Sequence, residues 1–222
     1  MDDVEARGRL SARPGAPPVD PIEAGLYELE LGDERDGILY VPEGDGARPL
    51  LLVLHGATMN AKQMLRPILA AADEAEVILL VPDSRSQTWD VLVGGYGPDV
   101  EFIDTALAAT FAQCKIDPAK IAIGGVSDGA SYALSLGVAN GDLFSSIVAF
   151  SPGFIAPPGV VGQPRVFVSH GTQDRILPID VCGRPIVAGL RGADYDVEYV
   201  EFDGGHEMPE GIVRAAFKWL RG

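Results

Sequence analysis

The hydrophobic residues of this chain fall into short continuous runs that alternate with longer amphipathic segments. Runs rich in Val, Ile and Leu, with few polar residues between them, are typical of strands buried on both faces of a parallel sheet. From residue 51 onward, six such runs predict strands at 51–55, 77–82, 120–125, 146–151, 165–170 and 196–202.

Two earlier apolar runs, 26–31 and 37–42, flank the polar stretch "GDERD" and predict an antiparallel hairpin. Segments 61–75, 98–114 and 209–221 have helical spacing of apolar residues. Pro67 should lie near the start of its helix or kink it. The pattern predicts an α/β fold: a doubly wound, mostly parallel sheet with an N-terminal antiparallel hairpin, which binds ligands at the carboxyl ends of its strands.

The first 24 residues differ from the rest, because they place Pro14, Pro17, Pro18 and Pro21 among charged and small residues. We expect residues 1–24 to form a flexible or surface-draped arm. Residues 25–222 are long enough for a single α/β domain, and they show neither internal repeats nor a second domain.

Composition and charge limit the classes of binding partner that we expect for this chain. With 17 basic and 32 acidic residues, the formal net charge is −15, so nucleic acid is a poor partner. No apolar run has the length of a membrane span, so we expect no membrane insertion. Cys114 and Cys182 are far apart in the sequence, and free thiols in the cytoplasm are the expectation, although one disulfide stays open. A homodimer is also left open.

The stretch "GGVSDGAS", from Gly124 to Ser131, contains the spacing G-x-S-x-G between a predicted strand and the helical pattern of 130–139. This context is typical of a nucleophile elbow, in which a serine occupies a sharp strand-to-helix turn. A side chain at Gly125 or Gly129 would crowd that turn. Ser127 is therefore the candidate nucleophile; the alternative is a glycine-rich turn with an incidental serine.

A serine nucleophile needs a base and an orienting carboxylate. His55 and His170 each end a predicted strand, whereas His206 follows the last strand, which suits the order Ser…Asp…His. His206 is therefore the candidate base and Asp174 the candidate acid, with Asp203 as a rival acid. We expect His55 to brace a loop instead.

A tetrahedral intermediate needs two backbone N–H donors. One should come from Asp128, directly after the nucleophile, and the other from "HGATMN", where Ala57 is preferred and Thr58 is next. We expect the Asp128 carboxylate to be solvated at the start of its helix, to disfavour anionic substrates and to play no part in proton transfer.

The connection 152–164 is too short for a helical lid, so we expect an open site without a cap domain, roofed by loops such as 84–98. The sequence contains no phosphate-binding, dinucleotide or metal-ligand motif, and we expect no cofactor and no metal. Candidate substrate-pocket residues, each of which could equally belong to the core, are Thr58, Trp89, Tyr96, Phe154, Ile176 and Met208.

The stretches "LHGAT", "GGVSDGAS", "HGTQDRILP" and "GGHEM" resemble the phospholipase/carboxylesterase branch of the α/β-hydrolase superfamily. "PDVEFIDTAL" is similar to the related polyhydroxybutyrate depolymerase and feruloyl esterase-like group. The resemblance runs from about residue 36 to the C-terminus and implies Ser127, Asp174 and His206 as the triad. It departs from that branch at Asp128, where glutamine is usual.

The resemblance implies a serine carboxylesterase that hydrolyses short- to medium-chain esters of small molecules through an acyl-enzyme. An acyl-thioesterase or lysophospholipase-type deacylase would use the same residues. A non-catalytic binding module on the α/β-hydrolase fold is the alternative from another class.

Overall fold

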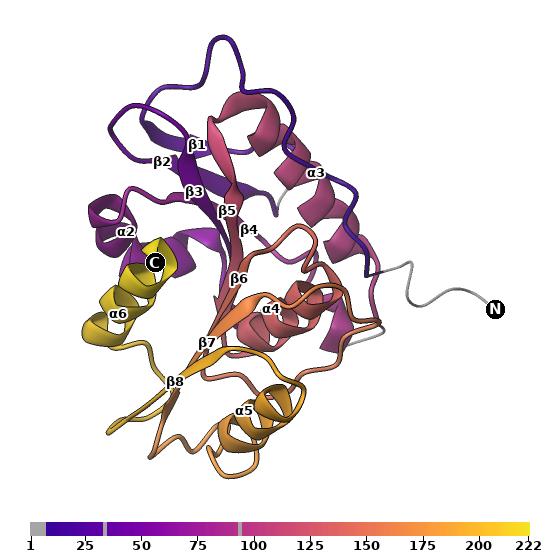
Figure 1. Cartoon of the computed structure of the whole chain (residues 1–222), viewed down its shortest axis with the longest axis vertical. Helices are drawn as coiled ribbons and strands as arrows, with labels where there is room; N and C mark the ends of the chain where they lie inside the picture. Colours follow the sequence, from indigo (N-terminus) through magenta and orange to yellow (C-terminus); the bar gives the residue numbers. More distant parts are fainter. Residues whose placement is uncertain (1–7, 33–34, 93–94) are drawn as a thin grey trace, which may run out of the picture.

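Eight strands form one sheet in the computed structural model, which describes residues 8–32, 35–92 and 95–222 (Figure 1). The strand order across the sheet is β1-β2-β4-β3-β5-β6-β7-β8. The strands are β1 (Gly25–Glu28), β2 (Gly37–Val41), β3 (Arg48–Leu54), β4 (Ile78–Pro82), β5 (Ile116–Val126), β6 (Ser146–Phe150), β7 (Arg165–Gly171) and β8 (Val197–Phe202).

The pairing of the strands confirms the predicted sheet. β1 pairs with β2 antiparallel, and β2 pairs with β4 antiparallel. All pairs from β4 and β3 across to β8 are parallel. The turn of the hairpin includes residues 33–34, which lie outside the described residues. β5 begins at Ile116, earlier than predicted, because an exposed stretch precedes the apolar run and pairs with β3 across a register shift.

Helices cover both faces of this sheet, and they are α2 (Ala61–Glu74), α3 (Pro98–Gln113), α4 (Asp128–Ala139), α5 (Gly183–Gly192) and α6 (Glu210–Arg221). Pro67 lies inside α2 rather than near its start. The sequence did not indicate α5, whose glycines and proline are poor helix formers. Packing of Ile186, Val187 and Leu190 against the sheet compensates for this weak propensity.

The two faces of the sheet bury separate hydrophobic clusters, as the alternation of side chains along β3 shows. Leu50, Leu52 and Leu54 belong to the cluster beneath α3, α4 and α5, whereas Leu51 and Val53 belong to the cluster beneath α2 and α6. Each buried leucine contributes about 1.5–3 kcal/mol. None of the helices in the described ranges is both long and apolar enough to cross a membrane.

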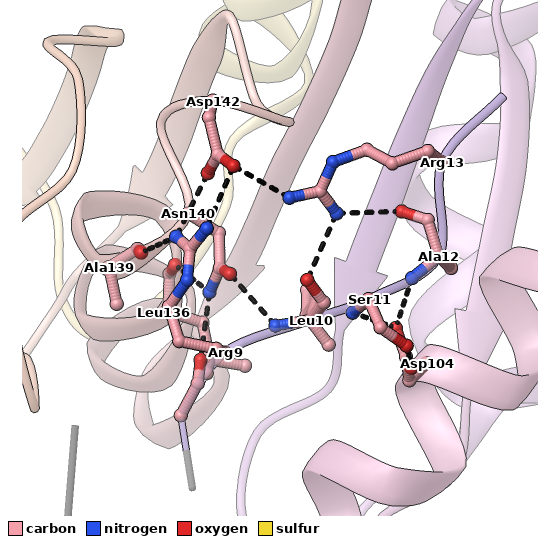
Figure 2. Close-up of polar contacts among 11 residues, drawn as sticks. Arg9, Leu10, Ser11, Ala12, Arg13, Asp104, Leu136, Ala139, Asn140 and Asp142 are labelled. Carbon is pink, nitrogen blue, oxygen red and sulfur yellow. Dashed lines mark hydrogen bonds and ion pairs between the residues drawn. The ribbon is translucent and has the colours of Figure 1, made fainter. Parts of the chain in front are cut away.

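The described part of the N-terminal arm starts beside the C-terminal end of α4 and contacts the middle of α3 (Figure 2), and it then runs along α3 (Figure 1). Asp104 of α3 accepts hydrogen bonds from the backbone N–H groups of Ser11 and Ala12, both at 2.8 Å. The guanidinium groups of Arg9 and Arg13 both contact the carboxylate of Asp142, each at 2.7 Å. These contacts hold residues 9–13 against the domain, while the division of the chain at residue 24 stays a prediction.

Asn140, at the end of α4, connects this arm to the core. It is fully buried; its Oδ1 accepts from the Leu10 N–H, and its Nδ2 donates to the carbonyl groups of Gly8 and Leu136, all at 2.9 Å. A buried polar group that loses its partner costs roughly 1–3 kcal/mol. The arm is therefore coupled to the stability of the domain through one amide side chain.

We expect Asn140→Ala to lower the free energy of unfolding by roughly 2 kcal/mol, because it leaves the Leu10 N–H and the Gly8 carbonyl without partners. Urea unfolding measures the change. In a chain that lacks residues 1–13, the same substitution should cost clearly less. Asn60→Ala, which removes the N-cap of α2 far from the arm, should cost the same in both chains. An equal cost of Asn140→Ala in both chains would contradict the coupling.

Candidate active site

The turn between β5 and α4 holds Ser127 in a strained backbone conformation, with φ 56° and ψ −120°. A positive φ at a residue other than glycine costs on the order of 1–3 kcal/mol and persists only where neighbours enforce it. Here the Ser127 N–H donates to the Phe150 carbonyl at 2.9 Å, and the Ser127 carbonyl accepts from the Ser131 N–H at 3.0 Å. The geometry is that of the predicted elbow.

The two motif glycines allow this turn to pack against the end of β3. A Cβ at Gly129 would lie 2.2 Å from the Leu54 carbonyl oxygen, and one at Gly125 would lie 2.6 Å from the same atom. Such approaches do not occur between real atoms, so any side chain would push the turn off β3. The motif glycines therefore fix where Ser127 stands.

The structure brings His206 and Asp174 together, as the sequence predicts. The Nδ1–H of His206 donates to Oδ2 of Asp174 at 2.6 Å, and Nε2 of the imidazole has no hydrogen-bond partner among the described residues. Oδ1 of Asp174 accepts from the N–H groups of Ile176 and Leu177, both at 2.9 Å. The rival acid, Asp203, accepts from Gln173 instead.

Asp174 is almost fully buried, and burial by itself would raise its pKa. The hydrogen bonds from His206, Leu177 and Ile176 outweigh burial, so the pKa of Asp174 lies below its ordinary value. The carboxylate therefore stays ionised beside His206, where it can hold and stabilise an imidazolium.

His170 belongs to this cluster, which sequence reasoning did not foresee. It is fully buried, and its Nε2 lies 2.7 Å from the Leu177 carbonyl and 3.3 Å from Oδ2 of Asp174. A Cβ at Gly183 would lie 2.5 Å from its Nδ1. The sequence signal that could have indicated this contact is the spacing of the two residues. His170 lies at the end of a strand, and Asp174 follows it by four residues.

His55 braces two loops, as expected. Its Nδ1–H donates to the Gly56 carbonyl at 2.7 Å, and its Nε2 accepts from the Ser84 N–H at 3.0 Å. Burial lowers the pKa of His55 below its ordinary value, so the ring remains neutral with both nitrogens engaged. It is therefore a structural residue at the carboxyl end of β3.

The amides that could stabilise an oxyanion are those of Ala57 and Asp128. The Thr58 N–H donates to the Gln87 carbonyl at 2.7 Å and is no longer available. Within the described ranges, no acceptor receives the N–H of Ala57 or of Asp128. Ala57 lies exposed in the loop after β3, and Asp128 is the first residue of α4.

The sequence led us to expect a solvated carboxylate at Asp128, and the structure differs from this expectation. It is half-buried, and its Oδ2 accepts from the Thr88 hydroxyl at 2.8 Å. The difference arises because the segment after β4 turns back across the elbow, which no local pattern shows.

The candidate pocket residues divide into two groups. Trp89 is fully buried, donates to the His55 carbonyl at 2.8 Å and stacks on Tyr132 with ring centroids 5.4 Å apart. Tyr96 is also buried and donates to the Ala156 carbonyl at 2.6 Å. The structure places both in the core rather than in a pocket, because their polar atoms find partners there. Thr58 and Ile176 are exposed, and Phe154 and Met208 are half-buried.

Residues 93–94 of the loop 84–98 are not described. The rest of this loop is fixed to the domain by hydrogen bonds. The carboxylate of Asp99 accepts from the N–H groups of Arg85 and Asp90, and Oδ2 of Asp90 accepts from those of Gly97 and Asp99. The Tyr132 hydroxyl donates to Oδ1 of Asp90 at 2.7 Å. Burial raises the pKa of Asp99 to about 6.

The connection between β6 and β7 contains neither helix nor strand in the described structure, and no cap domain covers the sheet edge. Ser127, Asp174 and His206 follow β5, β7 and β8, which run parallel and end at the same edge. The arrangement can activate a serine through a histidine and stabilise an oxyanion with two amides.

No family model matches the chain. Among curated proteins, it is 28% identical over 187 residues to "Putative esterase NocK" of Nocardia uniformis subsp. tsuyamanensis, an alignment that covers 79% of this chain and 50% of NocK. The chain thus spans about half the length of that relative. It is 26% identical over 215 residues to "Probable feruloyl esterase C" of Aspergillus terreus, which covers 80% of this chain and 78% of the relative.

Among solved structures, the Bacillus cereus carboxylesterase superposes with a TM-score of 0.65 at 22% identity, covering 85% of this chain and 94% of that one. This likeness concerns the fold. Together with the strand order, it confirms the predicted architecture: the chain has an α/β-hydrolase fold.

The raised pKa of Asp99 predicts a pH dependence of stability. Between the ordinary aspartate pKa of about 3.9 and about 6, the folded chain binds more protons than the unfolded chain, so the free energy of unfolding falls as pH rises. The shift corresponds to roughly 3 kcal/mol. Asp99→Asn removes this titration. The difference in free energy of unfolding between the parent and Asp99→Asn, measured by urea unfolding, should therefore change between pH 4 and about 7.

Asp142→Asn is the control. Hydrogen bonds from Arg9 lower the pKa of Asp142, so its titration lies at more acidic pH, and its stability difference from the parent should be flat above about pH 5. A pH-independent difference for Asp99→Asn would show that burial does not perturb its carboxyl group.

Proposed function

We propose that this chain is a serine carboxylesterase that hydrolyses short- to medium-chain esters of small molecules through an acyl-enzyme. The observation that carries the proposal is the hydrogen bond between His206 and Asp174, which leaves Nε2 free at the sheet edge where the strained elbow presents Ser127. The curated relatives are named as esterases, which supports the same reaction class.

In the proposed mechanism, Oγ of Ser127 attacks the ester carbonyl carbon while its proton passes to Nε2 of His206. Asp174 stabilises the imidazolium through Nδ1. The negative charge on the former carbonyl oxygen is stabilised by the N–H groups of Ala57 and Asp128. The C–O bond to the alcohol then breaks, and the departing oxygen takes the proton from His206.

The second half of the cycle repeats these steps with water. His206 takes a proton from a water molecule that attacks the acyl-enzyme, and the oxyanion forms again at the same two amides. The bond between the acyl carbon and Oγ of Ser127 then breaks, Oγ takes the proton back from His206, and the carboxylic acid is released. The same residues would serve a thioester or lysolipid deacylase, but no contact in the described structure favours those substrates. Nor does any observation favour a non-catalytic binding module.

The substrate is proposed as a neutral ester that reaches the site without a lid. Two of the relatives are named feruloyl esterases, so aromatic acyl esters belong in the substrate panel beside aliphatic ones. The net charge of −15 supports the absence of nucleic acid among the partners. Cys114 and Cys182 are free and buried, which supports a reducing, cytoplasmic location. A homodimer stays a prediction.

We expect Ser127→Ala to lower kcat/KM for a short-chain p-nitrophenyl ester by about 10⁴-fold or more, because no other hydroxyl takes the place of the nucleophile. Initial rates on the parent and the variant measure the loss. Ser145→Ala is the matched control, since its hydroxyl donates to the Ile121 carbonyl at the opposite end of the parallel strands. It should keep the parent activity. An active Ser127→Ala protein would place the nucleophile elsewhere.

A further inference from the structure

The two amides that we assign to the oxyanion come from separate parts of the chain. Ala57 lies in the loop after β3, and Asp128 begins α4 after β5. Oxyanion donors act well only when both lie at about 2.7–3.1 Å from the developing charge. Something must therefore fix the distance between the two loops.

A third segment, residues 84–89 after β4, holds the Ala57 loop from both sides. The Ser84 N–H donates to Nε2 of His55 at 3.0 Å, and the Trp89 indole N–H donates to the His55 carbonyl at 2.8 Å. On the other side of Ala57, the Thr58 N–H donates to the Gln87 carbonyl at 2.7 Å. We call residues 84–89 the bridging segment.

The bridging segment also reaches the second donor. The Thr88 hydroxyl donates to Oδ2 of Asp128 at 2.8 Å, and Thr88 stands between Gln87 and Trp89, the two residues bonded to the Ala57 loop. Among the described residues, no other side chain or backbone group donates to the Asp128 carboxylate. One hydroxyl thus connects the elbow to the segment that carries the other loop.

The bridging segment is itself fixed. Ser84 and Trp89 are fully buried, and Trp89 stacks on Tyr132 of α4. The buried carboxylate of Asp99 accepts from the N–H of Arg85, within the segment, and from the N–H of Asp90, directly after it. A segment anchored at both ends can transmit a position, whereas a mobile loop could not.

We propose that Thr88 is a positioning residue for the oxyanion hole: through the carboxylate of Asp128, it sets the separation of the Ala57 and Asp128 amides. The inference rests on the proposed esterase function. It also gives the aspartate at position 128 a role, since a side chain of this length accepts the Thr88 hydroxyl. Misplacement of a donor by about 1 Å can cost up to 10²-fold in rate.

The test compares Thr88→Val, which keeps the side-chain shape and removes the hydroxyl, with Thr88→Ser, which keeps the hydroxyl. We expect Thr88→Val to lower kcat about tenfold, to leave KM within about twofold, and to weaken inhibition by a trifluoromethyl ketone in parallel with kcat/KM. Thr88→Ser should recover most of kcat. Thr105→Val is the matched control, because it removes a hydroxyl that bonds only within α3. Its kcat and KM should equal those of the parent.

A double-mutant cycle separates positioning from general stability. In an Asp128→Ala background, which lacks the acceptor, Thr88→Val should have no further effect on kcat. Asp128→Ala should lose about tenfold in kcat, and Asp128→Asn, which keeps an acceptor, should lose clearly less than Asp128→Ala. This Asn–Ala comparison tests the proposal even if Thr88→Val does not fold.

Three results would overturn the proposal. The first is an unchanged kcat in Thr88→Val, and the second is additive losses of kcat for Thr88→Val and Asp128→Ala in the double-mutant cycle. The third is a loss of kcat in Thr88→Val that parallels a loss of thermal stability, while the trifluoromethyl ketone binds as tightly as to the parent. Each of these leaves the esterase function intact, because the parent still turns over ester. A parent that hydrolyses no ester would instead refute the proposed function.

Discussion

The close backbone contact between the nucleophile turn and the end of β3 is the constraint on which the site depends. Gly125 and Gly129 let the turn approach the Leu54 carbonyl more closely than any side chain would allow. This contact, with the hydrogen bond from Ser127 to the Phe150 carbonyl, keeps Ser127 at a positive φ that the free chain would avoid. The strain is balanced by the packing of α4 on the sheet, so the site is stable only in the complete fold.

The remaining polar groups around this turn are held by backbone amides and by side chains of neighbouring loops. Asp174 is fixed by two backbone N–H groups and by His206, and the buried His170 faces the same carboxylate. On the other side, His55 and residues 84–89 hold the loop that carries Ala57. The proposed base and the loop that carries Ala57 thus rest on independent supports, one at each side of β5.

Local patterns foretold the sheet, the elbow and the pairing of His206 with Asp174, because each has a short-range signature: apolar runs, glycine spacing, and a histidine after the last strand. They did not foretell α5, whose stability comes from packing of its apolar side chains rather than from propensity. Nor could they place Trp89 in the core or bring Thr88 to Asp128, since both depend on where the loop after β4 turns back. The assignment of the triad and of the oxyanion donors stays a prediction that these geometries support.

The most direct test of the account is covalent labelling of the parent protein with a fluorophosphonate, followed by mass spectrometry of the intact chain and of its peptides. An activated serine attacks the phosphorus, expels fluoride and gains a stable phosphonyl group. The account predicts one adduct per chain, located on the peptide that carries Ser127, with ester hydrolysis lost in proportion to labelling. An ester-hydrolysing protein that resists the reagent, or that carries its adduct on another residue, would contradict the account.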